Sequence, residues 1–165
     1  MADFYGNVAG YHAYCTARDH LHGNHQDDKV AAALIVASEW IDAVYRSGFG
    51  GLKVGQRAQL REWPRSGAVD IYLYAISSTT VPLEIENATY EAAHREIENQ
   101  GSLSTDYTPS KYKRASVDGA VSVEYKTFDS AAEAQTRLVI VDQILAPILT
   151  NKPQASSHAG YTIRA

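Results

Sequence analysis

The segment 27–46 has the clearest periodic pattern in the chain and constrains the fold most. Its apolar residues recur at helical spacing: Val30, Ala33, Leu34, Ala37, Ile41, Val44 and Tyr45. This spacing predicts an amphipathic α-helix with one apolar stripe. Asp27 can cap the start of this helix, and Gly48 can end it. Because an apolar stripe must be buried, the chain needs other elements that pack against this helix.

Three further segments show helical spacing. A short one covers 8–17, where Val8, Tyr11 and Cys15 share a face. A second covers 81–99, with Thr80 as a possible cap and Pro82 in the first turn. The third covers 130–149 and should bend or end at Pro147; its neighbouring Val139 and Ile140 suggest burial on two sides. The residues expected to be buried between the three long helices are Leu34, Ile41, Ile85, Ala92, Leu138, Val141 and Leu145.

Two segments have strand character. Residues 71–76 (IYLYAI) predict a short strand. In 117–126, Val117, Val121, Val123 and Tyr125 alternate with polar residues, which is typical of a half-buried strand. This second strand could pair with 71–76 or with a neighbouring subunit. The fold expected from the sequence is therefore mainly α, a small helical bundle with a β-hairpin or strand, a long loop and a C-terminal arm.

The long loop, residues 47–70, holds five glycines and one proline, so it predicts an irregular excursion. Loops of this length in compact domains tend to serve function or contacts. Within it, Trp63 should pin the loop onto the bundle and Pro64 should stiffen it. Arg65 should make a charge-assisted hydrogen bond to a carboxylate or carbonyl. These three residues are predicted to be structural anchors.

Two groups of residues could carry chemistry, and for each we favour the simpler interpretation. His20, His22 and His25 could bind a transition metal, but their spacing does not match a common structural zinc motif. Cys15 with His12 on the same helical face could be a nucleophile and base, although a buried thiol is far more common. Because no phosphate-loop, nucleophile-elbow or H-E-x-x-H motif is present, we expect no enzyme activity, no cofactor, no catalytic residue and no metal.

Charge bears on nucleic-acid binding. The formal net charge is −4 at pH 7, whereas proteins that grip nucleic acid usually carry a basic surface. Glu84, Glu91 and Glu98 lie on one face of the 81–99 helix and should face solvent or a channel. The alternative is a surface for single-stranded DNA, in which the basic residues of 53–65 and 111–114 are interleaved with Trp63, Tyr107 and Tyr112. We favour polar loops that meet an acidic neighbour.

Location and partners can be predicted only in outline. No apolar run of about 18 residues is present, so no membrane span is expected. The N-terminal segment lacks the pattern of a secretion signal, and the single cysteine favours a reducing compartment. Eleven tyrosines are unusual for the length and are typical of protein–protein interfaces. This favours a component of an assembly.

The C-terminal residues 150–165 are polar and show no period, so they predict an extended arm after a domain that spans 1–149. In an extended arm, Tyr161 and Ile163 would point to one side, with Thr162 and Arg164 opposite. Such spacing suits a segment that lies along another protein.

The order of these features resembles the tailed-phage head–tail connector adaptors, or head completion proteins, some of which are labelled DnaT-like single-stranded DNA-binding proteins. The resembling residues are Ala31–Arg46, Trp63–Asp70 (W-P-R-x-G-A-x-D), Val81–Ala93 and Ser122–Leu149. The resemblance implies a small α-helical bundle that forms a ring, usually a dodecamer, beneath the portal protein. The ring extends the channel for genomic DNA, without sequence-specific binding, and offers a docking surface to the next connector or tail terminator protein.

The resemblance also implies that the arm with Tyr161, Thr162, Ile163 and Arg164 binds the portal or a neighbouring subunit. The protein would then be located at the head–tail interface of the virion, and in the host cytoplasm during assembly. A single-stranded DNA-binding replication factor is the alternative function.

Overall fold

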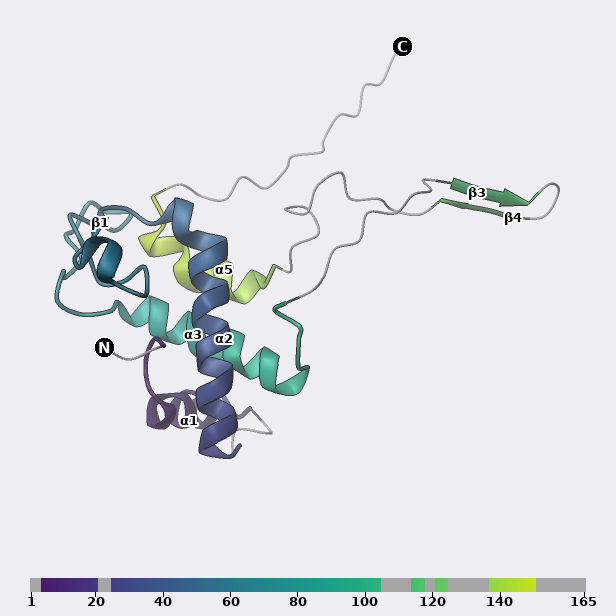
Figure 1. Ribbon diagram of the computed structural model, residues 1–165, viewed down its shortest axis with the longest axis horizontal. Helices are drawn as coiled ribbons and strands as arrows, with labels where there is room; N and C mark the ends of the chain where they lie inside the picture. The colour runs from purple at the N-terminus through teal and green to yellow at the C-terminus, as the bar shows by residue number, and fades with distance from the viewer. Residues whose placement is uncertain (1–3, 21–24, 105–113, 118–120, 125–136, 151–165) are drawn as a thin grey trace, which may run out of the picture.

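The computed structural model describes residues 4–20, 25–104, 114–117, 121–124 and 137–150. Its α-helices in these ranges are α1 (Val8–Ala17), α2 (Asp27–Tyr45), α3 (Leu83–Glu98) and α5 (Val139–Leu145), as Figure 1 shows. Three short 3-10 turns follow as η1 (Arg46–Gly48), η2 (Gln56–Ala58) and η3 (Ala146–Ile148). The mainly helical fold expected from the sequence is confirmed.

The core forms where the helices cross. α3 packs across α2, α5 packs on α3, and α1 contacts both long helices. The apolar stripe of α2 is buried as predicted, with Val30, Leu34, Ala37 and Ile41 fully inaccessible to solvent. Opposite it lie the buried Ile85 and Ala92 of α3 and the buried Val141 and Leu145 of α5. The helices therefore pack through the predicted stripes.

The start of each long helix differs from the prediction. The residue before α2 is Gln26, and Pro82 precedes α3, so neither Asp27 nor Thr80 is the N-cap. α5 begins only at Val139, because Leu138 has an extended backbone (φ −102°, ψ 101°) and is half-buried rather than buried. Residues 130–136 of the predicted helix lie outside the described residues. Val139 and Ile140 are exposed in the single chain, so the burial on two sides expected there is wrong for the isolated subunit.

The segment 71–76 is a turn and not a strand. The Oδ1 atom of Asp70 accepts hydrogen bonds from the backbone N–H groups of Tyr72 (2.8 Å) and Tyr74 (2.9 Å). Leu73 has a left-handed backbone, with φ 68°. A single antiparallel bridge joins Val69 to Ala75 across the turn. The Asp70 side chain thus satisfies the backbone groups that a strand partner would have satisfied.

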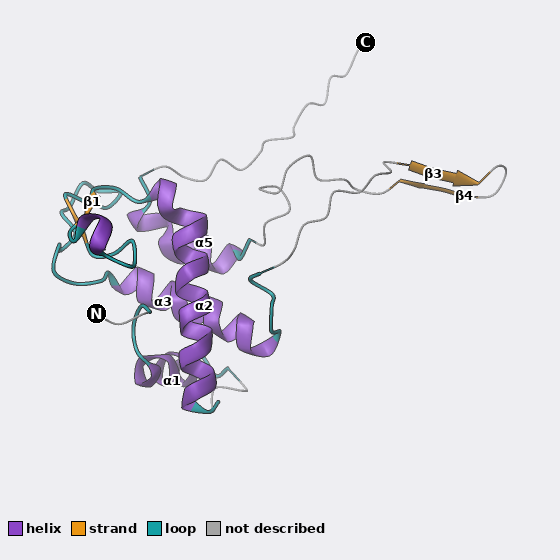
Figure 2. Ribbon diagram, viewed as in Figure 1, coloured by secondary structure: helices purple, strands orange, loops and turns teal. Residues whose placement is uncertain are grey.

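The predicted strand 117–126 is a two-stranded hairpin. β3 (Arg114–Val117) pairs antiparallel with β4 (Val121–Glu124), in the register Arg114 to Glu124 and Val117 to Val121. Among the described residues it does not pair with 71–76, and pairing with a neighbouring subunit stays a prediction. A second small sheet joins β1 (Leu52–Lys53) to β2 (Arg65–Ser66) within the long loop. Figure 2 shows that the remainder of this loop has little regular structure, as predicted.

Within the described ranges, every helix is too short or too polar to cross a membrane.

Candidate interaction surface

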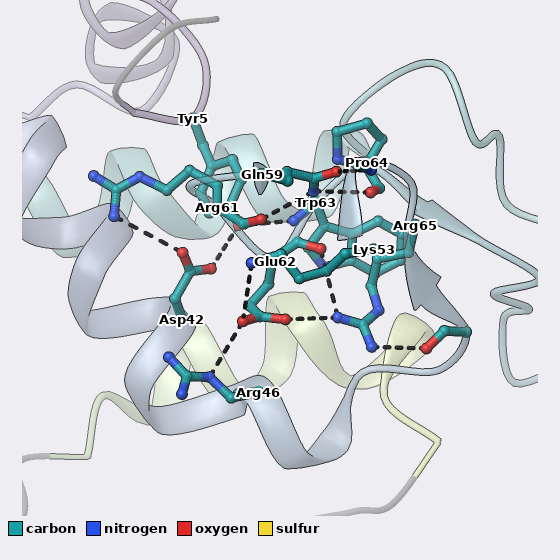
Figure 3. A network of polar contacts seen from close by, with 12 residues as sticks. Tyr5, Asp42, Arg46, Lys53, Gln59, Arg61, Glu62, Trp63, Pro64 and Arg65 are labelled. Atoms are coloured by element: carbon teal, nitrogen blue, oxygen red, sulfur yellow. Dashed lines mark hydrogen bonds and ion pairs between the residues drawn. The ribbon is translucent and has the colours of Figure 1, made fainter. Parts of the chain in front are cut away.

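The long loop packs against the end of α2 through Trp63, which is 2% exposed. The Trp63 ring meets the Phe49 ring edge to face, with centroids 5.6 Å apart. The backbone N–H of Trp63 donates to the hydroxyl of Tyr5 at 3.1 Å. Tyr5 comes from the segment before α1, so Trp63 joins the loop to the N-terminal segment as well as to the core (Figure 3). The peptide bond between Trp63 and Pro64 is cis.

Arg65 closes the loop on itself. Its guanidinium donates to the carbonyl oxygens of Gly50 (2.6 Å) and Gly51 (2.7 Å) and to Glu62 Oε2 (2.7 Å). Gly51 has φ +67°, and a Cβ atom there would lie 2.4 Å from the carbonyl oxygen of Ser66. The carbonyl of Gly51 can reach Arg65 only because this position has no side chain. One buried arginine therefore fixes both ends of the β1–β2 pair.

Two carboxylates, Glu62 and Asp42, form ion pairs with further basic residues of this region. Glu62 is 8% exposed and contacts Arg46 (3.2 Å) and Lys53 (3.8 Å) in addition to Arg65. Asp42 of α2 lies 3.8 Å from Arg61 and accepts a hydrogen bond from Tyr5 at 2.5 Å. Burial raises the pKa of Asp42, although Tyr5 and Arg61 act in the opposite direction. Figure 3 shows these contacts as one continuous polar network.

Four consecutive apolar residues are exposed directly after the long loop in the chain. We call residues 71–74 the apolar turn. The exposed fractions are 51% for Ile71, 71% for Tyr72, 80% for Leu73 and 71% for Tyr74. Two backbone hydrogen bonds fix the ends of the turn. The Ile71 N–H donates to the Pro147 carbonyl (2.8 Å), and the Ile76 N–H donates to the Ala68 carbonyl (2.9 Å). A fixed backbone thus presents apolar side chains to solvent, which marks a contact surface.

The acidic face predicted on α3 is only partly exposed. Glu91 is 1% exposed, whereas Glu84 is half-buried and Glu98 is exposed. The hydroxyl of Tyr14 donates to Glu91 at 3.4 Å, and Arg95 lies 3.5 Å from it. The expectation that all three glutamates face solvent or a channel is wrong for Glu91, because α1 covers that part of the helix.

Residues 1–165 match the model of a family described as "Putative DnaT-like ssDNA binding protein". The chain belongs to this family. No curated protein and no solved structure matches the chain.

Three of the loop residues predicted for a single-stranded DNA surface are buried in the single chain. Base stacking needs an exposed ring, and Trp63 is buried. Arg61 and Arg65 are also buried and contact carboxylates, so they cannot line an open groove. Of the other residues in this hypothesis, Arg57 is exposed and Lys53 is half-buried. Tyr107, Lys111, Tyr112 and Lys113 lie outside the described residues. Trp63, Arg61 and Arg65 therefore do not fit this hypothesis in the single chain, and the remainder of it stays a prediction.

The predicted C-terminal arm also lies outside the described residues, including Tyr161, Thr162, Ile163 and Arg164. The structure does describe its first residue. Thr150 donates to the carbonyl oxygen of Gly48 through its backbone N–H (2.9 Å) and its hydroxyl (3.0 Å). The preceding Leu149 forms a bridge with Phe49. The chain is thus fixed to the long loop as far as residue 150.

The predicted histidine group is divided. His22 lies outside the described residues, whereas His20 and His25 each lie near α3. The His20 ring is 4.3 Å from the ring of His94, centroid to centroid. A donor atom of His25 lies within 4.8 Å of donor atoms of His94 and Glu98. The spacing of the three predicted histidines did not indicate this group.

We expect Cys15 to react with thiol reagents at least about 100-fold more slowly in the folded protein than in the urea-unfolded protein at the same pH. Cys15 is fully buried, and burial raises the pKa of its thiol, so less of the reactive thiolate is present. His12, the predicted base, makes a contact of 3.1 Å with Asp27. The rate of disulfide exchange with a chromogenic reagent measures this protection; equal rates in both states would contradict it.

Proposed function

We propose that this protein is a structural subunit of a tailed-phage head–tail connector, without enzymatic activity. It would assemble as a ring, for which twelve subunits is the expected copy number, beneath the portal protein at the head–tail interface of the virion. The ring would extend the channel for genomic DNA and bind the next connector or tail terminator protein. The order of sequence motifs supports the connector assignment, and the apolar turn supports a role in assembly.

The apolar turn is the observation that carries this proposal. Four neighbouring apolar side chains, each at least half exposed, cost solubility in a free subunit. Tyrosine and leucine with a fixed backbone are suited to a protein interface, because little conformational entropy is lost on binding. Three of the four loop cations contact Glu62 or Asp42, namely Lys53, Arg61 and Arg65. Only Arg57 of the four is exposed, so most of the basic charge of the loop is paired with carboxylates. Contact with protein is therefore favoured over contact with phosphate.

A single-stranded DNA-binding role is the second candidate, and two observations favour it. One is the description of the family. The other is the pair Tyr72 and Tyr74, whose exposed rings have centroids 6.4 Å apart and planes tilted by 45°. Exposed aromatic rings can stack on bases and contribute about 1–3 kcal/mol for each base. The same turn could thus serve either function.

A substitution of Leu73 separates the two candidates. Leu73→Ser removes apolar contact area but leaves both tyrosine rings, so it should reduce ring formation with a candidate portal at least about tenfold. The affinity for an oligo-dT probe should be unchanged. Leu83→Ser is the matched control, because Leu83 is also an exposed leucine (65%) but lies at the start of α3. Electron microscopy of mixtures with the portal measures ring formation, and fluorescence anisotropy measures DNA binding.

Two results would reverse the assignment. One is tight, salt-dependent binding of oligo-dT that is lost in the double variant Tyr72→Ala, Tyr74→Ala. The other is normal ring formation by Leu73→Ser. Together they would favour the DNA-binding candidate.

We also expect that a chain ending at Thr150 keeps the fold of the full-length protein but loses stable portal docking. The contacts of Leu149 and Thr150 with the long loop are retained in this truncation. The melting temperature should therefore change by less than about 2 °C, since about 1 kcal/mol corresponds to 2–4 °C in a chain of this size. Calorimetry and co-sedimentation with the portal measure the two effects. Normal docking by the truncated chain would show that residues 151–165 are not the attachment arm.

A further inference from the structure

Three metal-ligating side chains meet where α2 begins and α3 ends. His25 lies just before α2, and His94 and Glu98 are one turn apart on α3. One donor atom from each lies within 4.8 Å of the other two. Residues four apart on a helix share a face, so His94 and Glu98 project to the same side. Two distant parts of the sequence thus converge on one point.

One donor atom at this point, Nε2 of His25, lacks an ordinary partner in the part of the chain that the structure describes. His25 Nε2 is buried and has no hydrogen-bond partner among the described residues. It lies 3.7 Å from Glu98 Oε1, which is too far for a hydrogen bond. A buried polar atom without a partner is costly, and a bound ion is one of its recognised explanations.

The orientation of His94 leaves one of its ring nitrogens for a ligand. Its Nδ1 atom lies 3.4 Å from the hydroxyl of Tyr11, which can hold the ring in place. Metal-binding histidines commonly use one nitrogen for the metal and the other for such a contact. His94 itself is 8% exposed, so its ring is fixed by packing.

We propose that His25, His94 and Glu98 form a binding site for one Zn²⁺ ion. Two imidazole nitrogens and one carboxylate oxygen are a ligand set that zinc prefers, and a fourth position remains for water. Bond lengths of about 2.0–2.2 Å place tetrahedral ligands about 3.3–3.6 Å apart. The His25–Glu98 distance of 3.7 Å is already close to this value. The three donor atoms lie within 4.8 Å of one another, so binding must draw them together by up to about 1 Å. The side chain of Glu98 is 40% exposed and can rotate to supply part of this movement.

The ion would connect the segment before α2 to the last turn of α3. Helices α2 and α3 already pack on each other, so the site adds a fixed point at one end of their interface. This is a structural role that goes beyond the proposed assembly function and does not depend on it. Because the ion binds only the folded chain, it should stabilise the fold.

The test uses the full-length chain without a histidine tag, after treatment with a chelator and titration with Zn²⁺ or Co²⁺. We expect one bound ion for each chain, visible absorption from Co²⁺ in a tetrahedral site, and a melting temperature that rises by about 5–10 °C at 100 times the dissociation constant. His25→Ala and Glu98→Gln should each weaken binding at least about tenfold. His12→Asn and Glu84→Gln are matched controls, which remove a histidine and a glutamate outside the cluster.

Two outcomes would overturn the proposal. One is the absence of both a thermal shift and a Co²⁺ spectrum in the wild-type chain. The other is binding that is equally tight in His25→Ala, Glu98→Gln and the controls, which would place the ion on other residues. If His25→Ala does not fold, Glu98→Gln alone tests the proposal, because the Glu98 side chain is partly exposed and glutamine has nearly the same shape as glutamate.

Discussion

Replacing Arg65 with alanine should lower the free energy of unfolding by about 3–5 kcal/mol, the range for breaking a buried ion pair. The substitution removes the hydrogen bonds to Glu62 and to the carbonyl oxygens of Gly50 and Gly51. Glu62 would keep Arg46 and Lys53 as neighbours, but both are farther away than Arg65. The carbonyl oxygens of the two glycines would lose their charged donor altogether.

Two further variants make this prediction specific. Arg65→Lys keeps the charge but cannot reach three acceptors with one planar group, so it should recover less than half of the lost stability. Arg57→Ala removes an exposed arginine of the same loop and should change stability by no more than about 0.5 kcal/mol. Urea denaturation followed by circular dichroism measures all three. A loss below about 1 kcal/mol for Arg65→Ala would contradict the role of this residue in closing the loop.

The helical core could be predicted because its signal is periodic and local. The stripe of α2 names its buried residues directly, and Ile85, Ala92, Val141 and Leu145 follow the same rule. Helix ends were predicted less well. Gln26 precedes α2 and Pro82 precedes α3, and neither side chain makes a capping hydrogen bond. The residues expected to cap these helices, Asp27 and Thr80, therefore do not mark the capping positions. Leu138 was placed in a helix because its spacing fits, yet its backbone is extended.

The errors on the β-elements have local causes that the sequence does contain. Ile71 to Ile76 has strong strand propensity, but Asp70 directly before it can bond to two following N–H groups. The backbone hydrogen bond from Ile71 to Pro147 then fixes the turn in a conformation that leaves its side chains exposed to solvent. In the second case, Asp118-Gly119 interrupts the alternation of 117–126 and is a typical hairpin signal. Reading that dipeptide as a turn would have predicted β3 and β4.

The candidate sites were harder to predict, because they depend on which elements meet. Glu84, Glu91 and Glu98 do share a helix face, as their seven-residue spacing requires. Only the packing of α1, with Tyr14 over Glu91, buries the middle one. The proposed zinc site has the same origin, since His25 and the His94–Glu98 pair are brought together by the crossing of α2 and α3. The four-residue spacing of His94 and Glu98 was the one local signal.

Replacing Trp63 with alanine should cost about 3–5 kcal/mol of stability, which is the usual range for removing a large buried aromatic ring. Trp63 is 2% exposed, and its ring fills the space between the long loop and the core beside Phe49. The backbone bond to Tyr5 remains in this variant, so the loss would come from the cavity and the lost apolar contact.

Trp63→Phe is the matched variant for this prediction. The indole Nε1 of Trp63 is buried without a hydrogen-bond partner among the described residues, so phenylalanine removes a polar group that already costs energy. It also keeps an aromatic ring against Phe49. We therefore expect a loss for Trp63→Phe that is less than half of the loss for Trp63→Ala, measured by urea denaturation.

The effect of Trp63→Ala should extend from stability to assembly. Trp63 and Arg65 fix the long loop, and Ala68 and Val69 connect this loop to the apolar turn. A loosened loop must be ordered again when a partner binds, and that ordering reduces affinity. Ring formation with the portal should therefore fall in Trp63→Ala at temperatures where the variant is still folded, while Trp63→Phe assembles normally. If Trp63→Ala folds and assembles as the wild-type chain does, then Trp63 does not anchor the surface that contacts the partner.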